Sequence, residues 1–496
     1  MSASSRFRMF IDNEFVESAS GEWFTTDNPF TGRPFAEVAS ANEEDVDRAV
    51  RSAHRAFNAP EWKGLTASQR GELLLRLADL IAAHVEELAV AEVRDNGKLI
   101  SEMRAQIAYM PQWYRYYGGL ANKVEGAHLP SDKKNTINFT RYEPLGVVAA
   151  IVPWNSPLLL LAWKLAPALA AGNTVVVKPS EFTSTSITPF MELVKDAGFP
   201  AGVVNVVTGT GPTVGAELVR HPLVRKVAFT GGETAGVAIA EAAGRRLIPA
   251  TLELGGKSAN VVFADANLDN AAKGVIGGIF AATGQTCVAG SRLLVQREIA
   301  DEFIERLLAI ARTARMGDPL STDTQVGPVT TPVQLGKILR HIEDAKAEGA
   351  RCVLGGGRAE RPECGTGWFV EPTIFTDVTP QMRLAREEVF GPVLAIMPFD
   401  TDEEAVSLAN STDYGLAAGV WTSDLKRAHR MAEQLQAGSV WINTYRTSAP
   451  MSPFGGYKRS GLGREGGADA IKQYLQVKSV WIDLNDEYPS PFVMRL

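Results

Sequence analysis

Short apolar runs alternate with amphipathic stretches from about residue 140 onwards, and this alternation restricts the fold more than any other feature of the chain. The runs GVVAAIVP, TVVVKPS, GVVNVVTG and RKVAFTG each precede a stretch in which apolar residues recur at helical spacing. Repeated strand–helix units of this kind form parallel sheets that helices cover on both faces. The pattern therefore predicts an α/β protein.

A second α/β series follows the segment LELGGKSANVVF and ends near GSVWINTY. Two segments fit neither series, HLPSDKKNTINFTRYEP at 128–144 and VKSVWIDLNDEYPS at 477–490, and both alternate apolar and polar residues. Such strands need a partner edge, so we expect them to form a small β flap used in oligomerisation. A chain of 496 residues is too long for one core and suggests two or three domains.

The charge balance and one hydrophobic stretch exclude two classes of partner. The net charge is −7 and no run of Lys or Arg occurs, so nucleic acid is not expected as a partner. Residues 146–172 are apolar and long enough to span a bilayer, but Pro153, Pro157 and Pro167 divide them into a strand, a turn and a helix. We therefore expect a buried core segment and no membrane contact.

The cysteines and the amino-terminal segment bear on the compartment. Cys287, Cys352 and Cys364 are odd in number and lack zinc-ligand spacing, so we expect free thiols and no metal site. The first residues, MSASSRFRMFIDNEF, contain no apolar signal core. Together these features favour the cytoplasm. We further expect Cys352 to lie in a core strand and Cys364 in an exposed turn.

Two glycine-rich turns follow successive predicted strands. VVTGTGPTVGAEL places Gly211 and Gly215 at a helix start, and FTGGETAG places Gly231 and Gly232 at the next one. Backbone N–H groups at such turns can bind phosphate, although turn glycines occur in many α/β proteins. Lys178 and Glu181 follow another strand, where they could contact ribose hydroxyls or simply lie in a solvated loop.

Two reactive side chains stand out, each with two interpretations. Cys287 lies in GQTCVAG, a glycine-flanked loop where its thiol could be a nucleophile, a redox thiol or a small buried residue. Glu253 lies in LELGGKS, where desolvation would raise its pKa as a general base requires, unless it forms a structural ion pair.

Two further stretches could assist such chemistry. Asn155 lies between prolines in PWNSP, which fixes the direction of an amide that could stabilise an oxyanion. Glu388 and Phe390 precede a Gly-Pro pair in EEVFGPV and could hold a ribose and cover a nicotinamide, or belong to a packed loop.

Taken together, these stretches resemble the aldehyde dehydrogenase superfamily over nearly the whole chain. The matching motifs, in order, are PWNSP, KPSE, FTGGETAG, LELGGKS, GQTCVAG, EEVFGPV, WINTY and PFGGYKRSGLGRE. The resemblance implies a Rossmann-like NAD-binding domain (1–127 and 145–254), an α/β catalytic domain (255–465) and a β oligomerisation segment (128–144 and 466–496). It also implies a homodimer or homotetramer.

The resemblance assigns a role to each candidate residue. Cys287 corresponds to the nucleophile, Glu253 to the general base and Asn155 to the oxyanion donor, helped by the backbone N–H of Cys287. The cofactor would be NAD in preference to NADP, because a 2′-phosphate would face the carboxylate of Glu181. The implied cofactor contacts are Pro153, Trp154, Lys178, Glu181, Gly211, Gly215, Gly231, Gly232, Leu254, Glu388 and Phe390.

The substrate is a small-molecule aldehyde of unspecified identity. Ser156 stands where many relatives carry an aromatic residue, which implies a wider or more polar substrate tunnel. Arg446 could bind a substrate carboxylate, or it could face solvent or an acidic residue at a subunit contact. The expected walls of the tunnel are Ser156, Trp163, Met110, Leu159, Arg446 and Ser448.

Two alternatives remain to the hydrolytic enzyme. One is a semialdehyde dehydrogenase that passes its thioester to coenzyme A, which would have no use for Glu253 as a water-activating base. The other is a non-catalytic structural or binding protein of the same fold. The joint presence of Cys287, Glu253 and Asn155 favours the hydrolytic enzyme over both.

Overall fold

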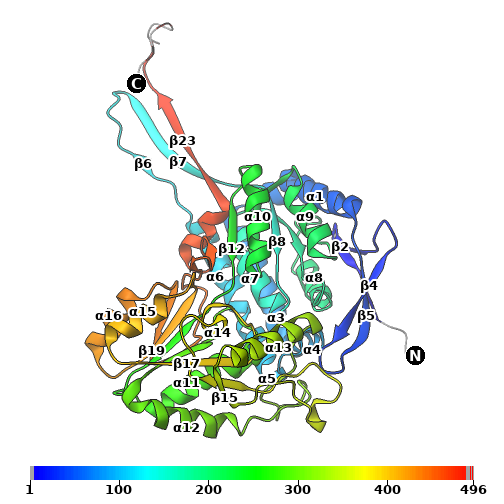
Figure 1. Ribbon diagram of the computed structural model, residues 1–496. Helices are drawn as coiled ribbons and strands as arrows, with labels where there is room; N and C mark the ends of the chain where they lie inside the picture. The colour runs from blue at the N-terminus through cyan, green and yellow to red at the C-terminus, as the bar shows by residue number, and fades with distance from the viewer. Residues whose placement is uncertain (1–4, 488–491, 493, 495–496) are drawn as a thin grey trace.

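Two large sheets with helices around them form the body of the protein, and a narrow three-stranded sheet projects from it (Figure 1). The computed structural model describes residues 5–487, 492 and 494. Within these ranges, no helix has the length and the apolar character needed to cross a membrane. The predicted α/β class and both predicted large sheets are confirmed.

The first sheet has eight strands in the order β22-β12-β11-β8-β9-β10-β2-β3. Its parallel strands are β8 (Val147–Ile151), β9 (Thr174–Lys178), β10 (Val204–Val206), β11 (Val224–Thr230) and β12 (Ala250–Glu253). The chain fills the sheet outward from β8 to β10 and then continues on the other side of β8 with β11. Ligands of open parallel sheets bind where the order reverses, which here is the carboxyl edge of β8 and β11.

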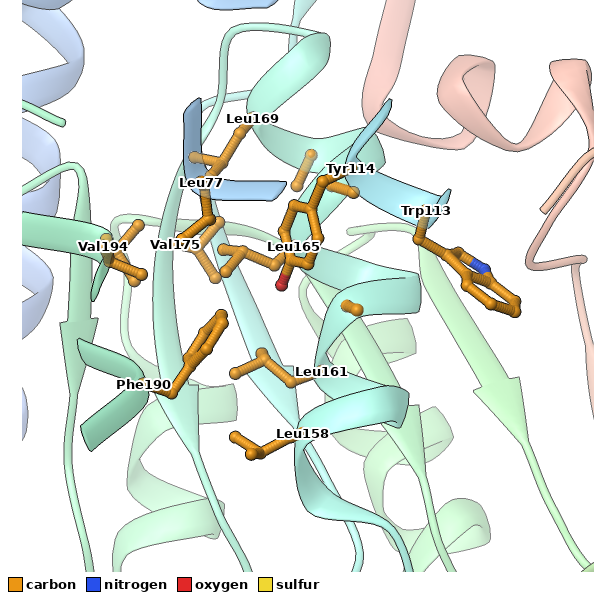
Figure 2. Packing of buried hydrophobic residues seen from close by; sticks show 14 of the residues in the cluster. Leu77, Trp113, Tyr114, Leu158, Leu161, Leu165, Leu169, Val175, Phe190 and Val194 are labelled. Carbon is orange, nitrogen blue, oxygen red and sulfur yellow. The ribbon is translucent and has the colours of Figure 1, made fainter. Parts of the chain in front are cut away.

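Continuous burial explains why β8 consists of valine, alanine and isoleucine and why β9 contains three successive valines. Every residue of β8 and β9 is buried, because helices cover both faces of the sheet. Helix α7 (Pro157–Ala170) packs Leu158, Leu161, Leu165 and Leu169 into the core on one face (Figure 2). The apolar stretch 146–172 is therefore β8, a turn and α7, as predicted.

The second sheet has the order β15-β16-β17-β14-β13-β19-β20. Its strands are β13 (Ala259–Val262), β14 (Arg292–Gln296), β15 (Arg351–Leu354), β16 (Thr373–Thr376), β17 (Val393–Phe399), β19 (Ala417–Trp421) and β20 (Ser439–Ile442). All its pairings are parallel except β15 with β16. The short strand β22 (Gly461–Leu462) returns to the first sheet and pairs with β12. The separation of the two sheets into domains, with a boundary at residue 254, stays a prediction.

The prediction for Cys352 is right about the strand but wrong about full burial, and the prediction of an exposed Cys364 is wrong. Cys352 lies on β15, the edge strand of the second sheet, and is only partly buried. Cys364 is 2% exposed, because its loop packs into a small cluster with Met316, Val326 and Phe369. The polar residues that flank Cys364 in the sequence did not indicate this tertiary contact.

The predicted β flap is confirmed as a three-stranded antiparallel sheet. It consists of β6 (His128–Leu129), β7 (Thr136–Pro144) and β23 (Leu475–Asp483), with β7 in the middle. Within the predicted segment 466–496, residues 468–474 form a 3₁₀ helix whose Ile471 and Tyr474 are buried in the body, and the bounds of the segment stay a prediction. Residues 488–491, 493, 495 and 496 of that segment lie outside the described residues.

Candidate active site

A cavity of about 150 Å³ opens at the carboxyl edge of β8, β11 and β12, where the first sheet faces the loops of the second. It brings together all three predicted catalytic residues and most of the predicted cofactor residues. Its lining includes Pro153, Trp154, Asn155, Leu160, Thr230, Gly231, Gly232, Glu253, Leu254, Gly255, Cys287, Gln334, Lys337, Glu388 and Phe390.

The loop that carries Cys287 is tightly anchored. Helix α11 (Leu268–Phe280) ends in a 3₁₀ turn, and Gly284 follows with φ +68°. A Cβ on Gly284 would lie 2.1 Å from the backbone oxygen of Gly391, so only glycine fits. Gln285 then bonds to Pro328 and Thr330 through its amide. The glycine before the thiol therefore serves close packing of the backbone.

Cys287 is partly exposed and faces the cavity, which does not favour an inert buried residue. Burial raises the pKa of its thiol to about 12, and the carboxylates of Glu388 and Glu253 act in the same direction. The backbone N–H of Val288 opposes this shift. At neutral pH the thiol is therefore protonated, and forming the thiolate requires a nearby proton acceptor.

Glu253 is the last residue of β12 and is 3% exposed. Neither of its carboxylate oxygens has a hydrogen-bond partner among the described residues. Burial raises the pKa of Glu253 well above its ordinary value, and the neighbouring Glu465 adds to the effect. The alternative of a structural ion pair fails, because the nearby Lys164 pairs at 2.5 Å with Glu465.

Asn155 is held on the loop that carries the thiol. Its Nδ2 donates to the backbone oxygen of Gln285 at 3.0 Å, and the side chain is buried. A primary amide has a second N–H, and the first bond fixes the plane in which it lies. Asn155 and the thiol loop therefore form one rigid unit, as an oxyanion donor requires.

The predicted nicotinamide contacts surround the same cavity. Glu388 accepts a hydrogen bond from the N–H of Gly256 at 2.9 Å, and burial raises its pKa. The ring of Phe390 packs edge-to-face against Trp154 with centroids 5.2 Å apart. Phe390 has φ +55°, a conformation that costs a phenylalanine about 1–2 kcal/mol and is common at functional sites.

Four predicted cofactor residues follow the same edge of the first sheet but do not line the cavity, namely Lys178, Glu181, Gly211 and Gly215. Lys178 is buried at the end of β9, and its Nζ lies 3.1 Å from Oε2 of Glu181. Gly211 and Gly215 bound a turn between β10 and helix α9 (Ala216–Arg220). Gly232 precedes helix α10 (Glu233–Arg245), whose first N–H groups receive no side-chain cap.

Three of the six predicted substrate residues line two further cavities. Arg446 lines one of about 670 Å³, and Trp163 and Ser448 line another of about 540 Å³. In the second cavity the rings of Trp113 and Trp163 are stacked with centroids 5.5 Å apart.

Three predicted wall residues lie elsewhere. Met110 has no exposed surface and packs in the first core, and Leu159 packs against that core while its neighbour Leu160 lines the catalytic cavity. Ser156 is 6% exposed, and its hydroxyl accepts a hydrogen bond from Lys98 and does not line a cavity. Successive residues of an α-helix point about 100° apart, so Leu159 and Leu160 face different surroundings. A prediction that is off by one residue therefore names a core residue in place of a wall residue.

The fold and the site define a class of enzyme. In this class a thiol and a buried carboxyl group line one cavity at the edge of a parallel sheet, at the point where the strand order reverses. The sequence profile described as the aldehyde dehydrogenase family matches residues 15–480. The chain belongs to the aldehyde dehydrogenase family.

Individual relatives match along nearly their full length. A (Z)-2-((N-methylformamido)methylene)-5-hydroxybutyrolactone dehydrogenase of Acinetobacter baylyi is 46% identical over 99% of this chain and 100% of its own. An aldehyde dehydrogenase of Aspergillus niger is 46% identical over 96% of this chain and 95% of its own.

Solved structures are equally similar. The NAD⁺ complex of an aldehyde dehydrogenase from Bacillus cereus has a TM-score of 0.95 and 44% identity, covering 97% of both chains. A betaine aldehyde dehydrogenase from Staphylococcus aureus, in complex with NAD⁺, has a TM-score of 0.96 and 39% identity, covering 98% of this chain and 97% of that one.

Proposed function

We propose that this protein oxidises an aldehyde to a carboxylic acid with NAD⁺, through a thioester on Cys287 that water hydrolyses. The observation that carries the proposal is the shared cavity of Cys287, Asn155 and Glu253. Formation of NADH and of free acid from a panel of aldehydes tests it. Release of a coenzyme A thioester in place of free acid, or no NADH with any aldehyde, would refute it.

The residues of the cavity support the following sequence. Glu253 accepts the thiol proton, because burial raises its pKa and so makes it a stronger base than an ordinary carboxylate. The Cys287 sulfur then attacks the aldehyde carbon, and the Asn155 amide with the backbone N–H of Cys287 donates to the oxyanion. The aldehyde hydrogen leaves as a hydride, which a bound nicotinamide would accept, and a thioester on Cys287 remains. Glu253 releases the thiol proton to solvent and then takes a proton from water, which attacks the thioester, so that the acid leaves and the Cys287 thiol forms again.

The cavity fits a nicotinamide on its own geometry. Only glycine fits at position 255 beside the carboxylate of Glu388, because a Cβ on residue 255 would lie 2.2 Å from that carboxylate. Glu388 and Phe390 would hold the nicotinamide ribose and ring, and Lys178 with Glu181 the adenosine ribose. The uncapped N–H groups at the start of α10 would meet phosphate. The chemistry that a bound nicotinamide supplies is acceptance of a hydride.

We expect NAD⁺ to be preferred over NADP⁺ by roughly tenfold to a hundredfold in kcat/KM. Glu181 is only partly exposed and already paired with Lys178, so a 2′-phosphate would meet a carboxylate and find the ammonium occupied. Glu181→Ser should reduce the preference, because it removes the repulsion and frees Lys178. The exposed Glu192→Ser on helix α8 (Ile187–Asp196) is the matched control. Equal kcat/KM for both cofactors in the wild-type enzyme would show that Glu181 does not discriminate between NAD⁺ and NADP⁺.

The flap supports assembly into a homodimer or homotetramer. Val477 and Trp481 on β23 are 60% and 55% exposed. They are four residues apart, so their side chains lie on the same face of the sheet. Exposed apolar strand faces of this kind mark association surfaces. The three free cysteines favour a reducing compartment, most simply the cytoplasm.

Replacing Val477 and Trp481 together by glutamate should dissociate the oligomer, as measured by light scattering after gel filtration. Lys478→Glu, which changes the net charge equally but lies on the other face, is the control. A wild-type monomer, or dissociation by the control alone, would contradict a role for this face.

A further inference from the structure

The cavity of about 670 Å³ beside the active site is lined mainly by polar and charged side chains. Helix α5 (Ile100–Tyr109), helix α11 and the loop after β20 form its walls. Its charged residues are Lys98, Lys273 and Arg446 against Glu102. Three cations and one anion give this space a positive potential that the catalytic steps do not use.

Lys98 is 6% exposed, and its Nζ donates to the hydroxyl of Ser156 at 2.7 Å. Within the described ranges it has no carboxylate within 4.0 Å. A buried ammonium without an ion pair is costly unless a ligand supplies the negative charge. Burial lowers the pKa of Lys98 to about 8, which agrees with an incompletely compensated charge.

Arg446 lines the same cavity and is partly buried. Its backbone has φ +64°, and its Nη1 donates to the backbone oxygen of Gly277 at 3.3 Å. No ion pair of Arg446 occurs in the part of the chain that the structure describes. A guanidinium has five N–H donors, so most of them remain available to a ligand with two oxygens.

The cavity is close to the reacting sulfur. Arg446 lowers the pKa of Cys287, and Cys287 in turn raises that of Lys98, so both cations interact with the thiol electrostatically. Glu102 accepts a hydrogen bond at 2.7 Å from the N–H of Ala282, which lies in the turn before the thiol loop. Lys98 also bonds to Ser156, the neighbour of Asn155, so the cavity contacts segments next to both Asn155 and the thiol loop.

We propose that the Lys98–Arg446 pocket, the cavity lined by these two residues, binds a carboxylate at the far end of the aldehyde substrate. The proposal rests on the aldehyde oxidation proposed above and names its substrate class. A planar carboxylate matches the fork of Arg446, and the Lys98 ammonium adds a point charge.

The first test compares 4-oxobutanoate with butanal, which has the same carbon chain without the carboxylate. Wild-type enzyme should favour 4-oxobutanoate by at least about tenfold in kcat/KM, and Arg446→Gln and Lys98→Met should each remove most of that ratio. Lys273→Met, an equal loss of charge at an exposed position of the same cavity, should leave the ratio within about twofold. A wild-type ratio near one, or an equal loss in Lys273→Met, would overturn the proposal.

The pH dependence of the same ratio gives a readout that does not depend on folding of the Lys98 variant. Glu102, Glu92, Arg446 and Cys287 are the groups that act on the charge of Lys98. Since Lys98 loses its proton above about pH 8, the ratio should fall between pH 7 and pH 9 in the wild type. A ratio that stays constant over this range would contradict a contribution from Lys98.

Binding without turnover separates this proposal from the proposed reaction. In Cys287→Ala, titration calorimetry should still show tighter binding of 4-oxobutanoate than of butanal, by about tenfold in Kd. If that preference is present but wild-type enzyme oxidises neither aldehyde, the proposed reaction fails and the pocket stands. If both aldehydes are oxidised but bind equally, the pocket fails and the reaction stands.

Discussion

Cys287→Ala is expected to abolish NADH formation with every aldehyde. The substitution removes the sulfur that is proposed to bond to the aldehyde carbon, and the methyl group that remains adds little strain because the side chain is partly exposed. Without the thiol, direct loss of hydride would first require hydration of the aldehyde. Steady-state NADH formation, compared with wild type at equal enzyme concentration, measures the effect.

Cys352→Ala is the matched control for this prediction. Cys352 lies at the edge of the second sheet, where its thiol bonds to the backbone oxygen of Leu354 at 3.2 Å and faces no catalytic residue. Wild-type turnover by Cys352→Ala together with silence of Cys287→Ala would assign the reaction to the loop thiol. Steady turnover by a folded Cys287→Ala enzyme would exclude covalent catalysis at this position.

Glu253→Gln is expected to produce a burst of about one NADH per active site followed by turnover lowered by about 10²–10⁴-fold. Glutamine has nearly the same shape but accepts no proton, so water at the thioester is no longer activated. The burst itself should also be slower than in wild type, since Glu253 no longer deprotonates a thiol whose pKa is about 12. Stopped-flow absorbance of NADH resolves both phases.

Two observations would oppose the role of Glu253. Glu241→Gln, on the exposed surface of α10, should behave as wild type, and an equal loss there would indicate a general charge effect. Addition of coenzyme A should not restore turnover to Glu253→Gln. Rapid turnover with coenzyme A would favour the acylating alternative, in which a thiol and not water takes the acyl group.

The parallel sheets were predictable because their signals are local. The valine-rich runs of β8 and β9 and the leucine spacing of α7 follow directly from burial on both faces of a sheet. The positions of the three proposed catalytic residues around one cavity were predictable for a related reason. Each lies at the end of a strand or in a short turn, so that Glu253 closes β12 and Asn155 follows β8.

Residues whose setting depends on contacts between distant segments were not predictable. Cys364 is buried by residues from other loops, and Lys98 is buried beside Ser156 although 58 positions separate them. No local pattern distinguishes such a lysine from an exposed one. The substrate walls failed likewise, because Met110 and Leu159 have the right character but point into the core.

Mass spectrometry of Glu253→Gln after a brief reaction with NAD⁺ and an aldehyde tests the central claim most directly. The account predicts an acyl adduct on the peptide that contains Cys287, at about one per chain, appearing at the rate of the NADH burst and absent without NAD⁺. A burst of NADH with no adduct on Cys287, or with the acyl group on Cys352 or Cys364, would contradict it.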